Sequence, residues 1–219
     1  MNKKNGVIFD LDGTLIDSET IFEKIAMKVF AEFGIELTAN TYSAWKGMPV
    51  QKIELAILHE FGTDFPITTF KNRFQSEWQE HLDHNGIDTM PGIKALLEQL
   101  AWEKVKISVA TSTPRDKALQ SLKLADLNIP QGRVIGGDMV ENGKPFPDIF
   151  VKAANSMKCN PHQCIVVEDS LIGVEGAKRA KMTTIFMSYP KNEHTEKIWD
   201  YLARSPEERD KILKKLLNI

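Results

Sequence analysis

The spacing of apolar residues divides the chain into regions where strand and helix patterns alternate and one region of helix patterns alone. Short runs that are apolar throughout predict strands buried on both faces of a parallel sheet. These runs span 7–9, 105–110, 133–136, 164–167 and 183–187. Apolar residues at helical spacing predict helices at 93–100, 115–124, 149–157, 171–180 and 205–217. Repeated strand–helix units imply a parallel sheet covered by helices on both faces.

The region of helix patterns alone lies between the first and second of these strands. Helical spacing begins at residue 19, again after Pro49, and again at residue 67. Three helices with no strand between them can pack only against one another or against a neighbour. The sequence therefore predicts an α/β fold whose core, residues 1–16 and 89–219, is a Rossmann-like, doubly wound parallel sheet. A small α-helical cap domain, residues 17–88, is inserted after the first strand.

Composition and charge narrow the classes of function. The 219 residues include 28 basic and 30 acidic side chains, a formal net charge of -2, which provides no bulk attraction for nucleic acid or an anionic membrane. No apolar run approaches the roughly 20 residues of a membrane span, and the polar start does not resemble a secretory signal. Cys159 and Cys164 fit neither a redox pair nor a zinc site. We expect a cytoplasmic protein with two reduced structural thiols, monomeric by default.

Two like charges directly follow the first predicted strand. Asp10 and Asp12 are spaced two apart, so in extended backbone both side chains point to the same side. Left alone, they would repel each other and resist desolvation. A calcium-binding loop needs glycine at its sixth position and a carboxylate at its twelfth, where this chain has Leu15 and Ile21. A helix cap beside a solvated acid remains the ordinary alternative for a single aspartate.

A second acidic pair makes a metal site the better interpretation. Glu168 and Asp169 follow another buried strand, and Ser170 behind them is a candidate helix cap. The carboxyl ends of parallel strands meet at one edge of a sheet, so the two pairs should converge there. Magnesium suits such a site, because it takes carboxylate oxygens, keeps several waters and leaves room for a phosphate. The cation would make the paired negative charges tolerable.

Two further strand ends provide candidate groups for binding an anion. Thr111, Ser112 and Thr113 supply hydroxyl and backbone N–H groups where a helix begins. For Thr113, which precedes a proline, a simple helix cap is the favoured alternative. Lys144 would ordinarily be a solvated lysine, but Pro145 enforces extended backbone and a helix start follows. A cation held at that loop would complete a phosphate site.

Together these motifs identify a family. "DLDGT" at 10–14, "ATS" at 110–112, "GKP" at 143–145 and "ED" at 168–169 occur in this order. The chain, over roughly residues 5–188, resembles the haloacid dehalogenase superfamily and within it the β-phosphoglucomutase-like phosphatases with a small helical cap. The resemblance implies a magnesium-dependent hydrolase of small phosphate monoesters, with a phosphorylated metabolite as its substrate.

The resemblance also implies a role for each acidic residue. Asp10 would take the phosphoryl group as an aspartyl phosphate, which divides one difficult displacement into two easier ones. Asp12 would protonate the departing alcohol and then activate the hydrolytic water. The magnesium ligands would be the Asp10 carboxylate, the Asp12 backbone carbonyl and Asp169. Glu168 would bind directly or through water.

The remaining implied contacts are with the substrate. Thr111 and Lys144 would bind the phosphoryl oxygens, where negative charge must be stabilised in the transition state. The other predicted substrate-binding residues are Ser112 and Arg115 in the core and Lys46 and Gly47 in the cap loop. Segments near 16–19 and 85–90 connect cap and core, and we expect them to act as hinges, since one half-reaction benefits from a closed site and the other needs water.

Departures from the mutase pattern favour a phosphatase. The sugar-phosphate mutases carry a cap histidine where this chain has Phe22 and a phosphate-gripping arginine where it has Val50. Without that arginine a bisphosphate loses a charge-assisted contact at its second end. A sugar-phosphate mutase is the alternative. A dehalogenase would not need the metal site, and a non-catalytic binding protein should show damage in at least one of the four motifs, which are all intact.

Overall fold

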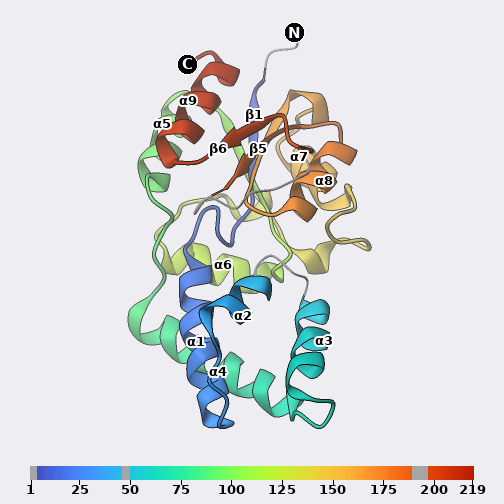
Figure 1. Ribbon diagram of the computed structural model, residues 1–219. Helices are drawn as coiled ribbons and strands as arrows, with labels where there is room; N and C mark the ends of the chain where they lie inside the picture. Colours follow the sequence, from blue (N-terminus) through green and yellow to red (C-terminus); the bar gives the residue numbers. More distant parts are fainter. Residues whose placement is uncertain (1–3, 46–49, 189–196) are drawn as a thin grey trace. The chain divides into compact units, whose positions relative to one another are not determined.

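The computed structural model describes residues 4–45, 50–188 and 197–219, apart from the side chain of Gln51. The chain forms two compact units (Figure 1). One consists of Met1–Ile16 and Asp88–Ile219, and the other is Asp17–Ile87. Within the described ranges, no helix is both long enough and apolar enough to span a membrane.

The first unit is built on a six-stranded sheet in which all neighbouring strands run parallel. The strand order is β3-β2-β1-β4-β5-β6. The strands are β1 (Gly6–Phe9), β2 (Lys106–Ala110), β3 (Val134–Ile135), β4 (Cys164–Glu168), β5 (Thr183–Met187) and β6 (Tyr201–Ala203). All residues of β1 and β4 are buried, as expected for central strands covered on both faces. The strand order reverses between β1 and β4, the kind of switch point where open α/β sheets bind ligands.

Helices lie on both sides of this sheet. Those of the first unit are α5 (Ile93–Trp102), α6 (Arg115–Leu124), α7 (Asp148–Ser156), α8 (Leu171–Arg179) and α9 (Pro206–Leu217). Helices α5 and α9 lie on one side and α7 and α8 on the other (Figure 1). Apolar side chains from α7, α8 and the sheet form one buried cluster, which includes Ile8, Ala110, Ile149, Phe150, Val166 and Ala177.

The pairing register brings two acidic residues to the same level and the same face. Ile8 is opposite Val166 in the β1–β4 pair, and both belong to the cluster under α7 and α8. Because side chains alternate along a strand, Asp10 continues the face of Ile8 and Glu168 continues that of Val166. The two carboxylates are therefore placed side by side, at the carboxyl ends of the two central strands.

The second unit is helical. It contains α1 (Ser18–Glu32), α2 (Ala39–Trp45), α3 (Val50–Phe61) and α4 (Ile67–Asn85). Phe30 of α1 is fully buried at its centre, and its ring centroid lies 4.4–5.9 Å from the rings of Trp45, Phe61, Phe65 and Phe70. Aromatic contacts of this kind add to the stabilisation from burying apolar area. The unit therefore has a hydrophobic core of its own.

The predicted fold class is confirmed, but one α-helix and one strand were not predicted. Helix α2 was not predicted because Asn40, Thr41 and Ser43 are poor helix formers. Its contribution to the core comes from Tyr42 and Trp45, which are buried on one face. Strand β6 was not predicted because it is only three residues long and lies at the sheet edge. Both elements depend on packing against parts of the chain distant in sequence.

Candidate active site

A buried ammonium group lies between two carboxylates at the ends of the central strands. Lys144 Nζ lies 2.6 Å from Asp10 Oδ1 and also donates to Glu168 Oε1. The exposed fraction of the Lys144 side chain is 4% and that of Glu168 is 0%. Lys144 precedes α7, the helix that covers this face of the sheet, and its Nζ is 5.4 Å from the ring centroid of Phe150 in α7. Lys144, which the sequence alone would suggest is solvated, is therefore a buried counter-ion to both carboxylates.

Burial and neighbouring charges shift the ionisation of both groups. Burial raises the pKa of Asp10 to about 7, helped by the Glu168 and Asp12 carboxylates and opposed by Lys144. Burial alone would lower the pKa of Lys144, but the Asp10 and Glu168 carboxylates outweigh it and raise that pKa above its usual range. Lys144 therefore stays charged at neutral pH. One ammonium does not balance the carboxylates gathered here, so a further cation would relieve their repulsion.

Three carboxylates are arranged to hold that cation. Asp10, Glu168 and Asp169 each offer an oxygen, and these oxygens lie within 4.8 Å of one another. Carboxylate oxygens are the ligands that a hard divalent cation such as magnesium takes, so this set fits one. Thr14 Oγ1 donates to Asp169 Oδ1 over 3.2 Å and orients that carboxylate. The predicted fourth ligand was the backbone carbonyl of Asp12, and its role stays a prediction.

The loop after β1 comes so close to Asp169 that only glycine fits at one position. Gly13 has a φ of +73°, and a Cβ there would overlap the Asp169 carboxylate, with Cγ only 3.0 Å away. The loop is closed by hydrogen bonds from Gly13 N to Ile16 O (2.9 Å) and from Leu15 N to Leu11 O (2.9 Å). Gly13 thus serves both the turn and the close approach of backbone to a carboxylate.

Glu168 is held from several directions. Its Oε2 accepts hydrogen bonds from Ser170 N (3.0 Å) and Ser170 Oγ (2.8 Å). Ser170 Oγ in turn accepts from Gly173 N (3.1 Å), which caps α8 as predicted. A Cβ at Gly173 would overlap the Glu168 carboxylate. The contacts of Gly173 and Thr14 with these carboxylates were not predicted, although a glycine three residues after a cap serine indicates a close approach.

The end of β2 contacts Asp12. Thr113 Oγ1 donates to Asp12 Oδ2 over 2.7 Å, and Thr113 N donates to Oγ1 of the buried Thr111 over 3.1 Å. The favoured expectation that Thr113 simply caps α6 was wrong, because the cap position belongs to Pro114, which makes no side-chain cap bond. Thr113 instead donates to the Asp12 carboxylate, which is 101 residues away in the sequence.

The other predicted substrate-binding residues are placed differently. The guanidinium of Arg115 donates to the carbonyl of Gln131 over 3.1 Å, and Ser112 is exposed. Lys46 and Gly47 lie outside the described residues. The roles of these four residues toward a substrate therefore stay predictions.

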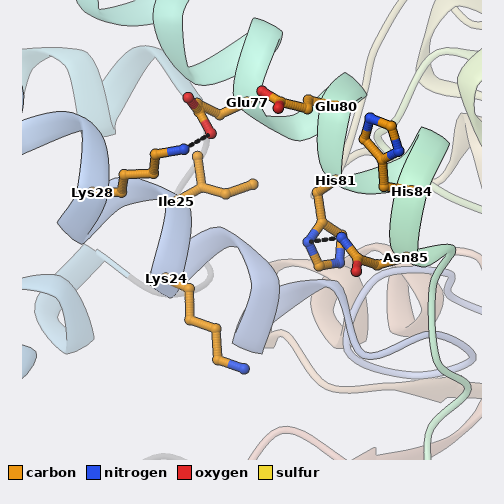
Figure 2. A pocket seen from close by; sticks show the side chains of 8 residues that line it. All are labelled: Lys24, Ile25, Lys28, Glu77, Glu80, His81, His84 and Asn85. Atoms are coloured by element: carbon orange, nitrogen blue, oxygen red, sulfur yellow. Dashed lines mark hydrogen bonds and ion pairs between the residues drawn. The ribbon is translucent and has the colours of Figure 1, made fainter.

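The helical unit contains a separate cavity of about 270 Å³ between α1 and α4 (Figure 2). Its lining residues are Lys24, Ile25, Lys28, Glu77, Glu80, His81, His84 and Asn85. The Lys28 ammonium points to Glu77, 2.5 Å away, and His81 turns toward Asn85 (Figure 2). Charges of both signs line this cavity, and Lys28 and Glu77 already pair with each other, so we assign no ligand to it.

Comparison with known proteins identifies the family. The family model for haloacid dehalogenase-like hydrolases matches residues 7–187. The chain belongs to this family. It is 31% identical over 184 residues to a phosphorylated carbohydrates phosphatase of Thermotoga maritima, covering 82% of this chain and 83% of that protein. It is 29% identical over 188 residues to the 6-phosphogluconate phosphatase of Escherichia coli, covering 85% and 83% of the two chains.

Solved structures of this hydrolase family share the fold. The β-phosphoglucomutase of Clostridium difficile superposes with a TM-score of 0.76 at 21% identity, covering 98% of this chain and 97% of that one. An identity this low shows the fold alone. The predicted family and the predicted enzyme class, a phosphatase of this hydrolase family, are confirmed by the family match and the relatives.

The close approach at Gly13 generates a prediction with a matched control. Gly13→Ala and Gly34→Ala both place a side chain at a φ of +73°, which costs about 1–2 kcal/mol in each case. Only Gly13 has a carboxylate in the way, since nothing lies within 4 Å of a Cβ at Gly34. Gly13→Ala should lower kcat/KM for p-nitrophenyl phosphate at least about a hundredfold by displacing Asp169. Gly34→Ala should keep kcat/KM within about threefold of the unsubstituted protein. Equal losses in the two variants would contradict the role of this contact.

Proposed function

We propose that this hydrolase is a magnesium-dependent phosphatase that cleaves small phosphate monoesters of sugar-like metabolites through an aspartyl phosphate on Asp10. The observation that carries the proposal is the buried contact of Lys144 with Asp10 inside a group of carboxylates suited to a divalent cation. Stability alone does not account for the buried lysine or for the carboxylates around it, because well-packed apolar residues would stabilise a buried site at least as well.

In the first step the Asp10 carboxylate attacks phosphorus, and the bond between phosphorus and the alcohol oxygen breaks. Asp12 gives a proton to that oxygen as it leaves. In the second step water attacks the aspartyl phosphate, Asp12 takes a proton from this water, and inorganic phosphate leaves with the Asp10 carboxylate restored. Asp12 suits this work because the hydrogen bond from Thr113 fixes the orientation of its carboxyl group.

Lys144 and Thr111 act on the phosphoryl group. Both side chains are buried, so a positive charge and a hydroxyl held there act in a site that excludes most water and need little reorganisation. Magnesium would be held by Asp10 and Asp169, with Glu168 direct or through water, and when bound it neutralises charge on the phosphoryl oxygens. Glu168, tied to Lys144 and Ser170, chiefly keeps the lysine in place.

The helical unit favours hydrolysis over phosphoryl transfer between sugar positions. Phe22, at the position of the mutase histidine, is held in an aromatic cluster, with its ring centroid 4.5 Å from that of Trp78 and 5.8 Å from that of Phe74. Val50, at the position of the mutase arginine, begins α3 and is 61% exposed. Neither residue can accept a proton or bind a phosphate. The relatives that hydrolyse phosphorylated carbohydrates and 6-phosphogluconate support a sugar-phosphate-like substrate.

The proposed chemistry is tested first at the two aspartates. Asp10→Asn and Asp12→Asn should each lower kcat for p-nitrophenyl phosphate by at least about a thousandfold, because each removes a group that takes part directly in bond making or proton transfer. Asp116→Asn, which changes an exposed carboxylate in the first turn of α6, should leave kcat within about twofold. Circular dichroism checks that all three variants fold. Turnover near the control value in either site variant would rule out the proposed roles.

Metal dependence is tested by titration. Hydrolysis should stop in excess chelator and return with magnesium. Asp169→Ala should raise the magnesium concentration for half-maximal rate at least about tenfold. Glu168→Gln should raise it less, because its amide oxygen can still accept from Lys144 or Ser170. Full activity in excess chelator, or a larger effect for Glu168→Gln, would contradict the proposed ligand roles.

Product analysis separates the phosphatase from the mutase. After incubation with β-glucose 1-phosphate and β-glucose 1,6-bisphosphate, inorganic phosphate should accumulate faster than glucose 6-phosphate. The physical reason is the absence of a cap cation at Val50 to hold the second phosphate. Related phosphate esters should also be cleaved with modest discrimination, since a missing hydrogen-bonding partner weakens selection between similar substrates. Faster formation of glucose 6-phosphate would show that the mutase is the correct function.

A further inference from the structure

The C-terminal segment, beyond residues 7–187 matched by the family, contains a fully buried arginine. Arg209 lies in the first turn of α9, is 1% exposed and is the largest of the fully buried side chains among the described residues. Burying a guanidinium is costly unless it is paired and hydrogen-bonded, and apolar residues of similar size often replace buried ion pairs without loss of stability. This cost points to a task that an apolar side chain would not perform.

The guanidinium contacts the segment that enters α5. Arg209 Nη1 and Nη2 each lie 3.4 Å from the carbonyl oxygen of Pro91. The next residue, Gly92, has a φ of +76°, and a Cβ there would be 3.2 Å from Nη2 and 3.7 Å from Pro206 Cβ. Arg209 Nε donates to Asp210 Oδ1 over 2.8 Å, which orients the guanidinium. The planar fork thus holds one backbone carbonyl, next to a glycine packed close against α9.

The residue before Pro91 is hydrogen-bonded to the loop 11–16 of the active site. Met90 N donates to Leu15 O over 2.9 Å, and Thr89 forms an antiparallel bridge with Ile16. The segment 88–92 is therefore fixed on one side by Arg209 and joined on the other to the loop 11–16.

That loop contains a proposed catalytic residue and contacts a proposed metal ligand. It begins after Asp10, contains Asp12, and places Gly13 against the carboxylate of Asp169. Thr14 of the same loop donates to Asp169. A continuous series of short contacts thus leads from α9 to a proposed metal ligand, and all of its members belong to the first compact unit.

We propose that Arg209 is a positioning residue, which fixes the Pro91 carbonyl and through segment 88–92 holds the loop 11–16 in the geometry that catalysis needs. The catalytic consequence rests on the proposed phosphatase activity. The ordering of the two segments does not depend on it. Apolar packing by α9 would hold the helix on the sheet but would not fix the position of a single backbone oxygen, which a pair of N–H donors does.

Hydrogen–deuterium exchange on the full chain tests the ordering. Arg209→Met keeps an apolar side chain of similar reach and removes the donors. Leu213→Ala, one turn further along α9, opens a cavity at a fully buried position and leaves the Arg209 donors in place. Arg209→Met should speed exchange in peptides covering 11–16 and 88–92 by about tenfold relative to Leu213→Ala, while exchange in β1 and β4 stays alike in the two variants.

Steady-state kinetics with p-nitrophenyl phosphate and magnesium test the consequence, well below the melting temperature of either variant. Arg209→Met should lower kcat about tenfold with KM changed less than about threefold, because the groups that react are misplaced while the phosphate contacts of Lys144 remain. Leu213→Ala should keep kcat within about twofold. Arg204→Met, the same change at an exposed arginine, should match the unsubstituted protein in both measurements.

Each outcome decides the proposal. Equal exchange in segments 11–16 and 88–92 for Arg209→Met and Leu213→Ala would reduce Arg209 to a packing residue. Faster exchange with unchanged kcat would overturn its link to catalysis.

If Arg209→Met does not fold, Arg209→Lys, which keeps the charge but loses the planar pair of donors, should give the same pattern at about a third of the effect. Wild-type behaviour of Arg209→Lys would then refute the proposal. If the unsubstituted protein hydrolyses no phosphate ester, the proposed function fails while the exchange comparison still tests the ordering.

Discussion

The burial of Lys144 between Asp10 and Glu168 is the interaction on which the rest of the site depends. Each carboxylate alone would resist desolvation at the end of a strand covered on both faces, and together they would repel each other. The ammonium makes the pair tolerable. It does so from the segment that precedes α7, on the face to which the strand alternation directs both carboxylates. The sheet topology and the ion pair are therefore two parts of one arrangement.

The negative charge that Lys144 does not balance explains why hydrogen-bond donors and backbone are packed closely around the carboxylates. Asp169 and Asp12 add negative charge, and each is oriented by a threonine hydroxyl, Thr14 for Asp169 and Thr113 for Asp12. Backbone also comes close to the acidic groups at Gly13 and Gly173, where a Cβ would overlap a carboxylate. Oriented donors and close backbone are what a site needs when it must hold a cation and a phosphoryl group in fixed positions.

The proposed role of α9 extends this arrangement beyond the family's matched region. Arg209, like Lys144, is a buried cation that donates hydrogen bonds to oxygen atoms, and its acceptors are the Asp210 carboxylate and the backbone carbonyl of Pro91. The helix contributes this contact in addition to its apolar packing through Leu213 and Leu217. A C-terminal element with no residue in the active site can thus affect catalysis through the segment that it orders.

The sequence by itself determined the α/β class, most of the strands and helices, and the four strand-end clusters, because local spacing and turn residues carry that information. It also predicted that Asp10 and Asp169 come together, since parallel strands end at one edge of a sheet. Tertiary structure decided the partners. Lys144 meets Asp10 across 134 residues, and Thr113 meets Asp12 across 101. Helix α2, strand β6 and the burial of Arg209 likewise depend on contacts between distant segments. No local pattern encodes those contacts, because the desolvation and pairing energies that favour them exist only once the sheet has formed.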